Sequence, residues 1–512
     1  MNEGHTRLSL RLQYHIDDTL TARGGRVKDD GPMAKRNSNE GYADVLIGPQ
    51  HGDEGKGRFI DALAANYDWV ARYNGGPNAG HTIEANGHRL ALHQVPSGVN
   101  YPDKKLYIGA QCVVNLEKLC QEIDELEAAG LDILHRLRIA AQASVIQPGH
   151  IIRDVQTMKS VGTTGNGIGA TYADQALRVN NGRRLDVRLG ELRMNPKEAF
   201  AMIRKNLEVE IETHNLTHTD IEGCIRKLEA AFDRIKHCIE KDPLLLCREI
   251  RAGMRVLLEG AQAYGLDRLH GVTPDVTSSS TGVAVAFDST EIPVDYKRNA
   301  YAVAKLIPTR VGSGPFPTEY GGERSEEYCM TDDGKKYTKD VEWSMHGHRF
   351  HELLRSEDPL DLGIAVRMAG NEYGASTGRP RRPGALDLMQ LSRTIEANGI
   401  DGIYLTKADC LNIFAQTREK IISIGTGYRI NGDSIPYVPT TKEELQQVKP
   451  VIESFPSFAE NISEARSIDE LPPALRLLLA VIRERLDTPI LAIGVGPRRE
   501  QVVQWNGAIH RA

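Results

Sequence analysis

The feature that most constrains the fold of this chain is a repeated alternation of short apolar runs with segments of helical spacing. Seven runs have the composition of β-strands: ADVLI at 43–47, WVARY at 69–73, LYIG at 106–109, RVLLEG at 255–260, AYAVAKLI at 300–307, GIYLTKAD at 402–409 and PILAIGVGP at 489–497. Between several of them apolar residues recur at helical spacing, as in NLEKLCQEIDELEAAG, where Asn115 can cap a helix and Gly130 can end it. Strands that alternate with helices predict an α/β fold with a mainly parallel central sheet flanked by helices.

Charge and composition exclude several classes of function. The 512 residues are 40% hydrophobic and 26% charged, and the net charge of −6 comes from scattered residues, so neither a nucleic-acid footprint nor a basic membrane patch is present. No apolar stretch approaches the roughly 20 residues of a membrane-spanning helix, and the N-terminus lacks the apolar core of a signal peptide. The seven cysteines are odd in number and form no Cys-x-x-Cys pair, which is typical of reduced thiols. We therefore expect a cytoplasmic protein that acts on small molecules.

The chain divides unevenly along its length. Residues 1–41 are polar and predict a flexible N-terminal extension, followed by one catalytic domain over 42–512. Within that domain, residues 196–250 are rich in helical patterns, while 320–365 is charged and poor in apolar residues, so we expect a surface insertion there. The insertion contains HGHRFH, whose histidines could hold a metal, although an exposed, mobile loop is the preferred interpretation: His346, His348 and His351.

A glycine-rich loop follows the first apolar run. It is GPQHGDEGKGR, residues 48–58, and it departs from the P-loop pattern because Lys56 is followed by Gly57 instead of a hydroxyl residue. Bare backbone amides around a lysine can still cradle phosphate. A carboxylate at Asp53 fits such a nest if a divalent cation bridges it to phosphate, or if it takes a proton from a substrate. The alternative is a glycine-rich turn with incidental acids, and Glu54 has no assigned role.

A second polar loop, NGGPNAGHT at 74–82, follows another predicted strand. His81, between Gly80 and Thr82, could act as a general acid or stabilise a phosphoryl group during transfer. A histidine in a turn is also often merely solvated or capping.

Together, GDEGKG and NAGHT resemble the adenylosuccinate synthetase family. Further motifs agree in the same order: VPSGV at 95–99, VGTTGNGIGATYADQALR at 161–178, EGAQAYGLD at 259–267, PDVTSSST at 274–281, PTRVGSGPFPTE at 308–319, NEYGASTGRPRRPG at 371–384 and YLTKAD at 404–409. The resemblance covers roughly residues 43–500 and implies a P-loop-related α/β fold with helical and loop insertions. It also implies ligation of IMP and L-aspartate to adenylosuccinate at the expense of GTP, through a 6-phosphoryl-IMP intermediate.

The resemblance implies roles for individual residues. Asp53 matches the catalytic base, His81 the catalytic acid, and Lys56 a catalytic phosphate contact, while Asp53 and the Gly80 carbonyl match Mg²⁺ contacts. Asp409 could accept both the N1–H and the 2-amino hydrogens of guanine. The full set of GTP-binding positions is Gly52, Gly55, Lys56, Gly57, Thr82, Lys407, Asp409, Gly494, Gly496 and Pro497.

Two more groups match the other substrates. The IMP-binding positions are Asn78, Thr164, Arg178, Gln262, Thr277 and Arg379, and the aspartate-binding positions are Ser376, Thr377, Gly378, Arg379 and Arg381. Arginines suit a dicarboxylate because they offer bidentate, permanently charged partners. Arg178 matches an arginine that reaches the neighbouring subunit's substrate phosphate, so a homodimer is implied.

Several positions depart from the family pattern and bear on which nucleotides are used. They are His51 in place of tryptophan, Asn166 in place of arginine, Gln175 in place of lysine, and GVGP at 494–497 in place of Ser-Thr-Gly-Pro.

Two other functions remain open from the sequence. A related phage branch uses GMP or dGMP and typically lacks the base aspartate. The presence of Asp53 therefore favours IMP as the substrate, without excluding GMP or dGMP. A GTP-binding regulatory pseudoenzyme is the other alternative, but it would not need Asp53, His81, Arg379 and Arg381 together.

Overall fold

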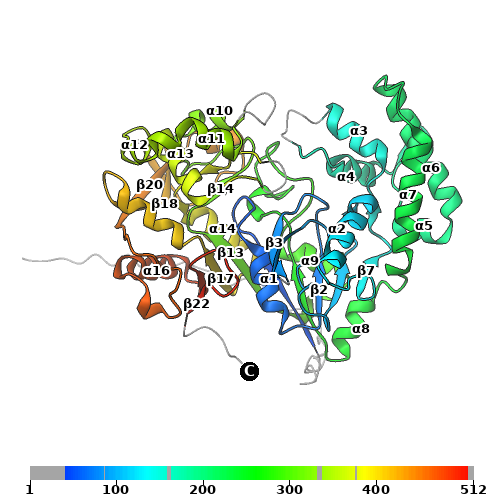
Figure 1. Cartoon of the computed structure of the whole chain (residues 1–512), viewed down its shortest axis with the longest axis horizontal. Helices are drawn as coiled ribbons and strands as arrows, with labels where there is room; N and C mark the ends of the chain where they lie inside the picture. The colour runs from blue at the N-terminus through cyan, green and yellow to red at the C-terminus, as the bar shows by residue number, and fades with distance from the viewer. Residues whose placement is uncertain (1–40, 86, 158–162, 331–336, 375–377, 506–512) are drawn as a thin grey trace, which may run out of the picture. The chain divides into compact units, whose positions relative to one another are not determined.

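The central element of the fold is a ten-stranded sheet in the order β11-β7-β5-β2-β12-β1-β13-β17-β21-β22 (Figure 1). The computed structural model describes residues 41–505 apart from 86, 158–162, 331–336 and 375–377. All seven predicted strands lie in this sheet: β1 (Tyr42–Ile47), β2 (Trp69–Arg72), β5 (Lys105–Ile108), β12 (Arg255–Glu259), β13 (Lys297–Lys305), β17 (Gly402–Thr406) and β21 (Ile490–Gly494). The other three are β7 (Leu137–Ala140), β11 (Ile239–Glu240) and β22 (Val502–Gln504).

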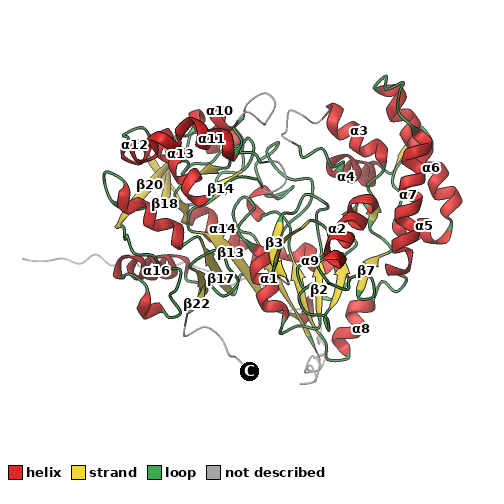
Figure 2. Cartoon of the chain, viewed as in Figure 1, coloured by secondary structure: helices red, strands yellow, loops and turns green. Residues whose placement is uncertain are grey.

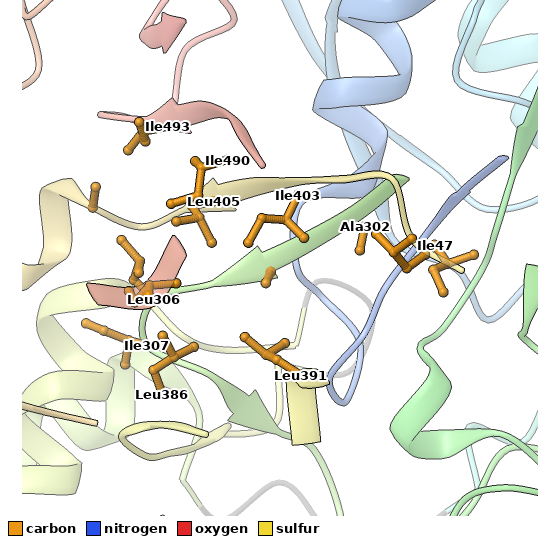
Figure 3. Packing of buried hydrophobic residues seen from close by; sticks show 14 of the residues in the cluster. Ile47, Ala302, Leu306, Ile307, Leu386, Leu391, Ile403, Leu405, Ile490 and Ile493 are labelled. Carbon is orange, nitrogen blue, oxygen red and sulfur yellow. The ribbon is translucent and has the colours of Figure 1, made fainter. Parts of the chain in front are cut away.

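The strands pair in parallel except at the β21–β22 edge, which is antiparallel, so the prediction of a mainly parallel sheet is confirmed. Strands β2, β17 and β21 are buried along their whole length, as expected of parallel strands covered on both faces. Figure 3 shows how the side chains of neighbouring strands pack together, among them Ile47 of β1, Ala302 of β13 and Leu405 of β17. This core holds the strand ends in register.

Helices alternate with these strands, as Figure 2 shows. They include α1 (Lys56–Ala64), α2 (Leu116–Ala128), α9 (Val283–Thr290), α14 (Leu388–Asn398) and α16 (Pro473–Leu486). The predicted cap of α2 is confirmed, because the Asn115 side chain accepts a 3.0 Å hydrogen bond from the Lys118 backbone N–H. Gly130, with φ +82°, follows the end of that helix.

A second group of helices covers residues 148–251. It consists of α3 (Pro148–Thr157), α4 (Ile168–Leu177), α5 (Leu189–Met194), α6 (Pro196–Thr213), α7 (Ile221–Ile235) and α8 (Leu245–Arg251). Helix α6 packs on α3 and α7 packs on α2.

Most of the described residues in the predicted insertion at 320–365 are helical, so the expectation of an exposed loop around His346, His348 and His351 is wrong, while the insertion itself stays a prediction. The helices are α10 (Glu323–Cys329), α11 (Lys339–His346), α12 (Phe350–Arg355) and α13 (Pro359–Gly370). Glu342 of α11 and Arg367 of α13 are fully buried and form an ion pair, with Nε 3.0 Å from Oε2. Glu342 is the buried residue of α11, whose apolar side chains are exposed, so apolar spacing did not reveal that helix. Helix α13 differs, because its Ile364, Val366 and Met368 are buried. His346 Nε2 lies 3.2 Å from the Tyr328 hydroxyl.

A smaller sheet was not predicted. In it β18 (Ile421–Ile430) pairs with β16 (Leu386–Asp387), β19 (Asp433–Ile435) and β20 (Lys449–Pro456). Short paired strands complete the set: β3 (His81–Ala85), β4 (His88–Leu92), β6 (Val113–Val114), β8 (Ser144–Val145), β9 (Val179–Asn180), β10 (Arg183–Arg184), β14 (Thr309–Arg310) and β15 (Arg382–Pro383), with the short helix α15 (Lys442–Gln446). Among the described residues, no helix has both the length and the apolar character that crossing a membrane requires. The first 40 residues lie outside them, so the predicted N-terminal extension and its boundary stay predictions.

Candidate active site

The predicted site loops meet because they follow neighbouring parallel strands. Strand β1 lies between β12 and β13, and β2 and β17 pair with the outer sides of those two. At the strand ends, Leu46 is in register with Glu259, and Lys305 with Thr406. Since the carboxyl ends of parallel strands share one edge of the sheet, the loops after β1, β2, β12, β17 and β21 all open on that edge.

The phosphate loop, which is the glycine-rich segment 48–58, connects β1 to the start of α1. Gly52, Asp53 and Gly55 have left-handed backbones, with φ of +90°, +58° and +91°. Gly55 is the N-cap residue of α1 and Lys56 is its first residue, so the unpaired amides of the helix start face the loop. Asp53 is exposed, which leaves its carboxylate accessible to a substrate.

Glu54, which the sequence left without a role, organises this loop from inside. Its side chain is fully buried, and Oε1 accepts hydrogen bonds from the backbone N–H of Gly52 at 2.8 Å and of Gln50 at 3.3 Å. The Lys56 ammonium donates to Oε2 at 2.6 Å. The Thr406 hydroxyl donates to the Glu54 backbone carbonyl at 2.9 Å, which fastens the loop to the end of β17.

His81 is the first residue of β3 and lies against the phosphate loop. A Cβ added to Gly57 would sit only 2.8 Å from the Cβ of His81. Its Nδ1 pairs with Oε1 of Glu259, the last residue of β12. Ser97 holds the same carboxylate, with its hydroxyl donating to Oε1 at 2.5 Å and its backbone N–H to Oε2 at 2.7 Å. Glu259 and Ser97 belong to the EGAQ and VPSGV motifs, but the sequence did not identify them as site residues.

The ionisation of His81 and Glu259 follows from their burial, from the hydrogen bond between them and from nearby charge. Burial lowers the pKa of His81, and the hydrogen bond to Glu259 only partly opposes that effect. Burial would raise the pKa of Glu259, but the hydrogen bond from His81 and the charge of Arg72 outweigh it, so the net shift is downward. Glu259 is therefore ionised and accepts a hydrogen bond from Nδ1 of His81, which leaves Nε2 as the ring nitrogen that can serve a substrate.

Asp53 also contacts the loop that was matched to aspartate. Arg381 Nε lies 2.9 Å from Asp53 Oδ2, and an N–H of the same guanidinium donates to Glu372 Oε2 at 2.6 Å. Glu372 was not predicted. Ser376 and Thr377 lie outside the described residues; Gly378 and Arg379 follow them, and the Arg379 carbonyl accepts a 2.8 Å hydrogen bond from the Gly374 N–H.

Two of the residues matched to IMP, Gln262 and Thr277, lie in the segment that follows β12. Gln262, after β12, has φ +57°, and its Oε1 accepts a 3.4 Å hydrogen bond from the Ser279 hydroxyl. Its Nε2 is buried and has no hydrogen-bond partner among the described residues. Such an unsatisfied donor is costly unless a ligand accepts from it. Thr277 donates its backbone N–H to Leu266 O at 2.8 Å.

Asn78 and Thr164 are connected through Asn166. The Asn166 side-chain amide donates to Thr164 Oγ1 at 3.0 Å and to Pro77 O at 3.5 Å, and Asn78 is the next residue along the chain. Arg178 lies elsewhere, exposed after the end of α4. It lines a surface hollow together with Gln175, Arg184, Arg188 and Lys241.

The positions matched to guanine lie after β17 and β21. The Ala408 N–H donates to Gly494 O at 3.3 Å, so the two loops touch. Arg58, a residue that the sequence did not single out, holds the second loop by donating to Gly496 O at 2.7 Å and to Gln501 O at 2.6 Å. Burial raises the pKa of Asp409, against the opposing charge of Lys407.

A metal ion would have few protein ligands here. Among the described residues, no group of three or more His, Cys, Asp or Glu side chains is arranged around a common point for a metal. The oxygen donors expected at Asp53 and at the Gly80 carbonyl nevertheless fit Mg²⁺, which is commonly held by one or two protein oxygens together with substrate phosphates and water.

Comparisons with known proteins show which family this chain is similar to. A sequence model of the adenylosuccinate synthetase family matches residues 45–503. Adenylosuccinate synthetase 2 of Cupriavidus pinatubonensis is 41% identical over 465 residues, which is 90% of this chain and 97% of that protein. Adenylosuccinate synthetase of Bifidobacterium adolescentis is 34% identical over 91% of this chain and 99% of its own length.

Solved structures show the same relationship. The fully ligated adenylosuccinate synthetase of Plasmodium falciparum matches with a TM-score of 0.77 and 31% identity, over 91% of this chain and all of that one. Cyanophage S-2L succinoaminodeoxyadenylate synthetase matches with a TM-score of 0.52 and 16% identity, over 91% of this chain and 95% of that one, which shows a shared fold alone. The length and identity of these matches show that the chain belongs to the adenylosuccinate synthetase family of ligases.

Proposed function

We propose that this chain joins IMP and L-aspartate to form adenylosuccinate, at the expense of GTP, with the predicted site residues in the roles given below. The observation that carries the proposal is the contact between Asp53 of the phosphate loop and Arg381 of the aspartate loop. That contact brings a base, a phosphate nest and a carboxylate-binding arginine to one point, where a reaction of three substrates needs them.

The first step is transfer of a phosphoryl group to the purine. Asp53 takes the N1 proton of IMP, so that O6 becomes the nucleophile toward the γ-phosphorus of GTP. The new O6–P bond forms as the bond to the GDP oxygen breaks. Lys56, the loop amides and His81 surround the oxygens of the group in transit, which is where such a reaction needs positive charge and hydrogen-bond donors.

The second step forms the carbon–nitrogen bond. The amine of aspartate attacks C6 of the 6-phosphoryl intermediate, the C6–O6 bond breaks, and phosphate leaves with a proton from the amine. Arg381 and Arg379 orient the dicarboxylate, and Gln262 donates its unsatisfied N–H to the purine.

Mg²⁺ is the proposed cofactor, held by Asp53 and the Gly80 carbonyl; when bound it neutralises charge on the phosphate oxygens. Gly80 immediately precedes His81, so the metal contact and the general acid come from the same loop.

Guanine is the proposed base of the phosphate donor. Asp409 can accept from both N1–H and the 2-amino group, a pair of donors that adenine does not present. The contact between Ala408 and Gly494 places the loop 494–497 beside this carboxylate, and Arg58 holds that loop.

A homodimer in the cytoplasm completes the proposal. Arg178 is exposed between Leu177 and Val179, which are 54% and 48% exposed, and its φ of +64° is unusual for an arginine. An exposed cation flanked by apolar side chains suits a contact with a second copy of the chain. All seven cysteines lie within the described residues and none forms a disulfide, which suits a reducing compartment.

The test is a substrate profile of the purified full-length protein. IMP, GMP and dGMP would each be incubated with aspartate, Mg²⁺ and either GTP or ATP, and the products would be separated by chromatography and weighed by mass spectrometry. We expect adenylosuccinate from IMP with GTP, and little from the other combinations. Turnover of dGMP without turnover of IMP would overturn the substrate assignment, and full activity of Asp53→Ala would overturn the mechanism.

A further inference from the structure

Glu372 lies at the meeting point of three parts of the site. It follows α13, and its side chain is 3% exposed. Its Oε2 accepts from Lys305 Nζ at 2.7 Å and from an Arg381 N–H at 2.6 Å, and its Oε1 lies 3.0 Å from Lys407 Nζ. Lys305 ends β13, Lys407 follows β17, and Arg381 belongs to the aspartate loop.

This carboxylate is strongly held in its ionised form. Burial would raise the pKa of Glu372, but the charges of Lys305, Lys407 and Arg381 outweigh that effect and hold the pKa far below its usual range. Arg381 also faces Asp53, so buried charges of both signs meet in this cluster and each group depends on the position of its neighbours.

Lys407 and Arg381 each make a second contact besides the one to Glu372. The Lys407 ammonium donates to Gly370 O at 2.8 Å as well as pairing with Glu372, so two partners within the protein fix its polar end. The Arg381 guanidinium spans from Glu372 to Asp53, 2.9 Å away. Lys305 differs, because its other partner is the buried Thr309 hydroxyl at 2.7 Å.

We propose that Glu372 is a positioning residue that orients Arg381 of the aspartate site and Lys407 of the guanine site from a single carboxylate, and so couples recognition of aspartate to recognition of GTP. This inference rests on the proposed function for the identity of the two substrates. Neither cation can shift without changing the contact that the carboxylate makes with the other cation, which is the physical basis of the coupling.

The test uses two variants and one control. Glu372→Gln removes the charge and keeps the shape; Lys305→Met combined with Glu372→Gln removes the carboxylate together with the cation that it neutralises inside the protein. Glu210→Gln is the matched control, because Glu210 is also a buried carboxylate that accepts from an arginine, Arg153 Nε at 2.9 Å, but it lies on α6. KM for each substrate, kcat, and the ratio of kcat/KM for GTP over ATP would be measured.

In both Glu372 variants we expect KM for aspartate and KM for GTP to rise together, each by about 10-fold or more, from the loss of a charged hydrogen bond. KM for IMP should change by less than about threefold, since the hydrogen bonds of Asn78, Gln262 and Thr277 are made with Gly76, Ser279 and Leu266. The preference for GTP over ATP should fall as well, and the control should match the wild type.

The opposite outcomes are distinct. A rise in only one of the two KM values, or a fall in kcat with every KM unchanged, would overturn the coupling and leave a structural role. If the single variant is insoluble, the double variant becomes the test, because it leaves no unpaired lysine at position 305. If neither variant folds, the role of Glu372 is structural and the proposal fails. A wild type that makes no adenylosuccinate would instead refute the proposed function, and calorimetric binding of GDP and aspartate would still test the coupling.

Discussion

The interior carboxylate of the phosphate loop offers the sharpest single perturbation. In Glu54→Gln the side chain keeps its shape, and its amide oxygen can still accept from the Gly52 and Gln50 amides, but Lys56 loses its charged partner. Both side chains are buried, at 0% and 3% exposure, so the lysine cannot turn to water as a substitute.

The magnitude follows from that burial. Breaking a buried ion pair costs about 3–5 kcal/mol, and the retained backbone contacts favour the lower end, about 3 kcal/mol. With an unfolding entropy of about 2.1 cal/mol/K per residue, a chain of 512 residues loses about 1 °C in Tm for each kcal/mol. We therefore expect Tm to fall by about 3 °C.

The kinetic effect should be larger than the thermal one. Without Glu54 the Lys56 ammonium is no longer fixed beside the loop amides, and losing one charge-assisted contact to phosphate should lower kcat/KM for GTP by about 10- to 100-fold. Scanning calorimetry measures the first quantity and initial rates at varied GTP the second. Glu84→Gln, an exposed glutamate on β3, is the control and should change neither. Unchanged Tm and unchanged kcat/KM in Glu54→Gln would refute this account of the loop.

Two further predictions concern the roles proposed for His81 and Arg178. His81 must carry a proton on Nε2 to act as an acid, so kcat/KM should fall as pH rises through its pKa, which burial places below the ordinary 6.5. His81→Asn should remove that limb and slow the reaction by about 10²- to 10⁴-fold; the same limb persisting in the variant would assign it to another group. If Arg178 serves the neighbouring subunit, Arg178→Ala and Asp53→Ala should each be inactive or weak alone, yet mixing them should restore about a quarter of wild-type activity in hybrid dimers. Mixtures no more active than their parents would argue against a shared site, and sedimentation would report the oligomer itself.

Local pattern was enough to predict much of the fold. The seven apolar runs all became strands of the central sheet because parallel strands are covered on both faces and so must be continuously apolar. The cap at Asn115 and the glycines of the phosphate loop could also be predicted, because each depends on the backbone conformation of a few neighbouring residues.

Helix α11 was missed because its buried residue is the charged Glu342, which pairs with Arg367, and a charge pair has no sequence period. The same limit applies to the carboxylates that organise the site. Glu259 meets His81 across 178 residues of chain, and Glu372 meets Lys305 across 67.

The sequence by itself determined which strands exist, which loops we expect to carry chemistry and which family the chain resembles, because those features depend on local composition and on the order of motifs. Only the tertiary structure decided that Glu54 faces inward, that Glu259 pairs with His81 and that one carboxylate at Glu372 contacts Lys305, Lys407 and Arg381. The physical reason is that a charged side chain takes its role from the charges that strand order places around it, and strand order is a property of the whole sheet.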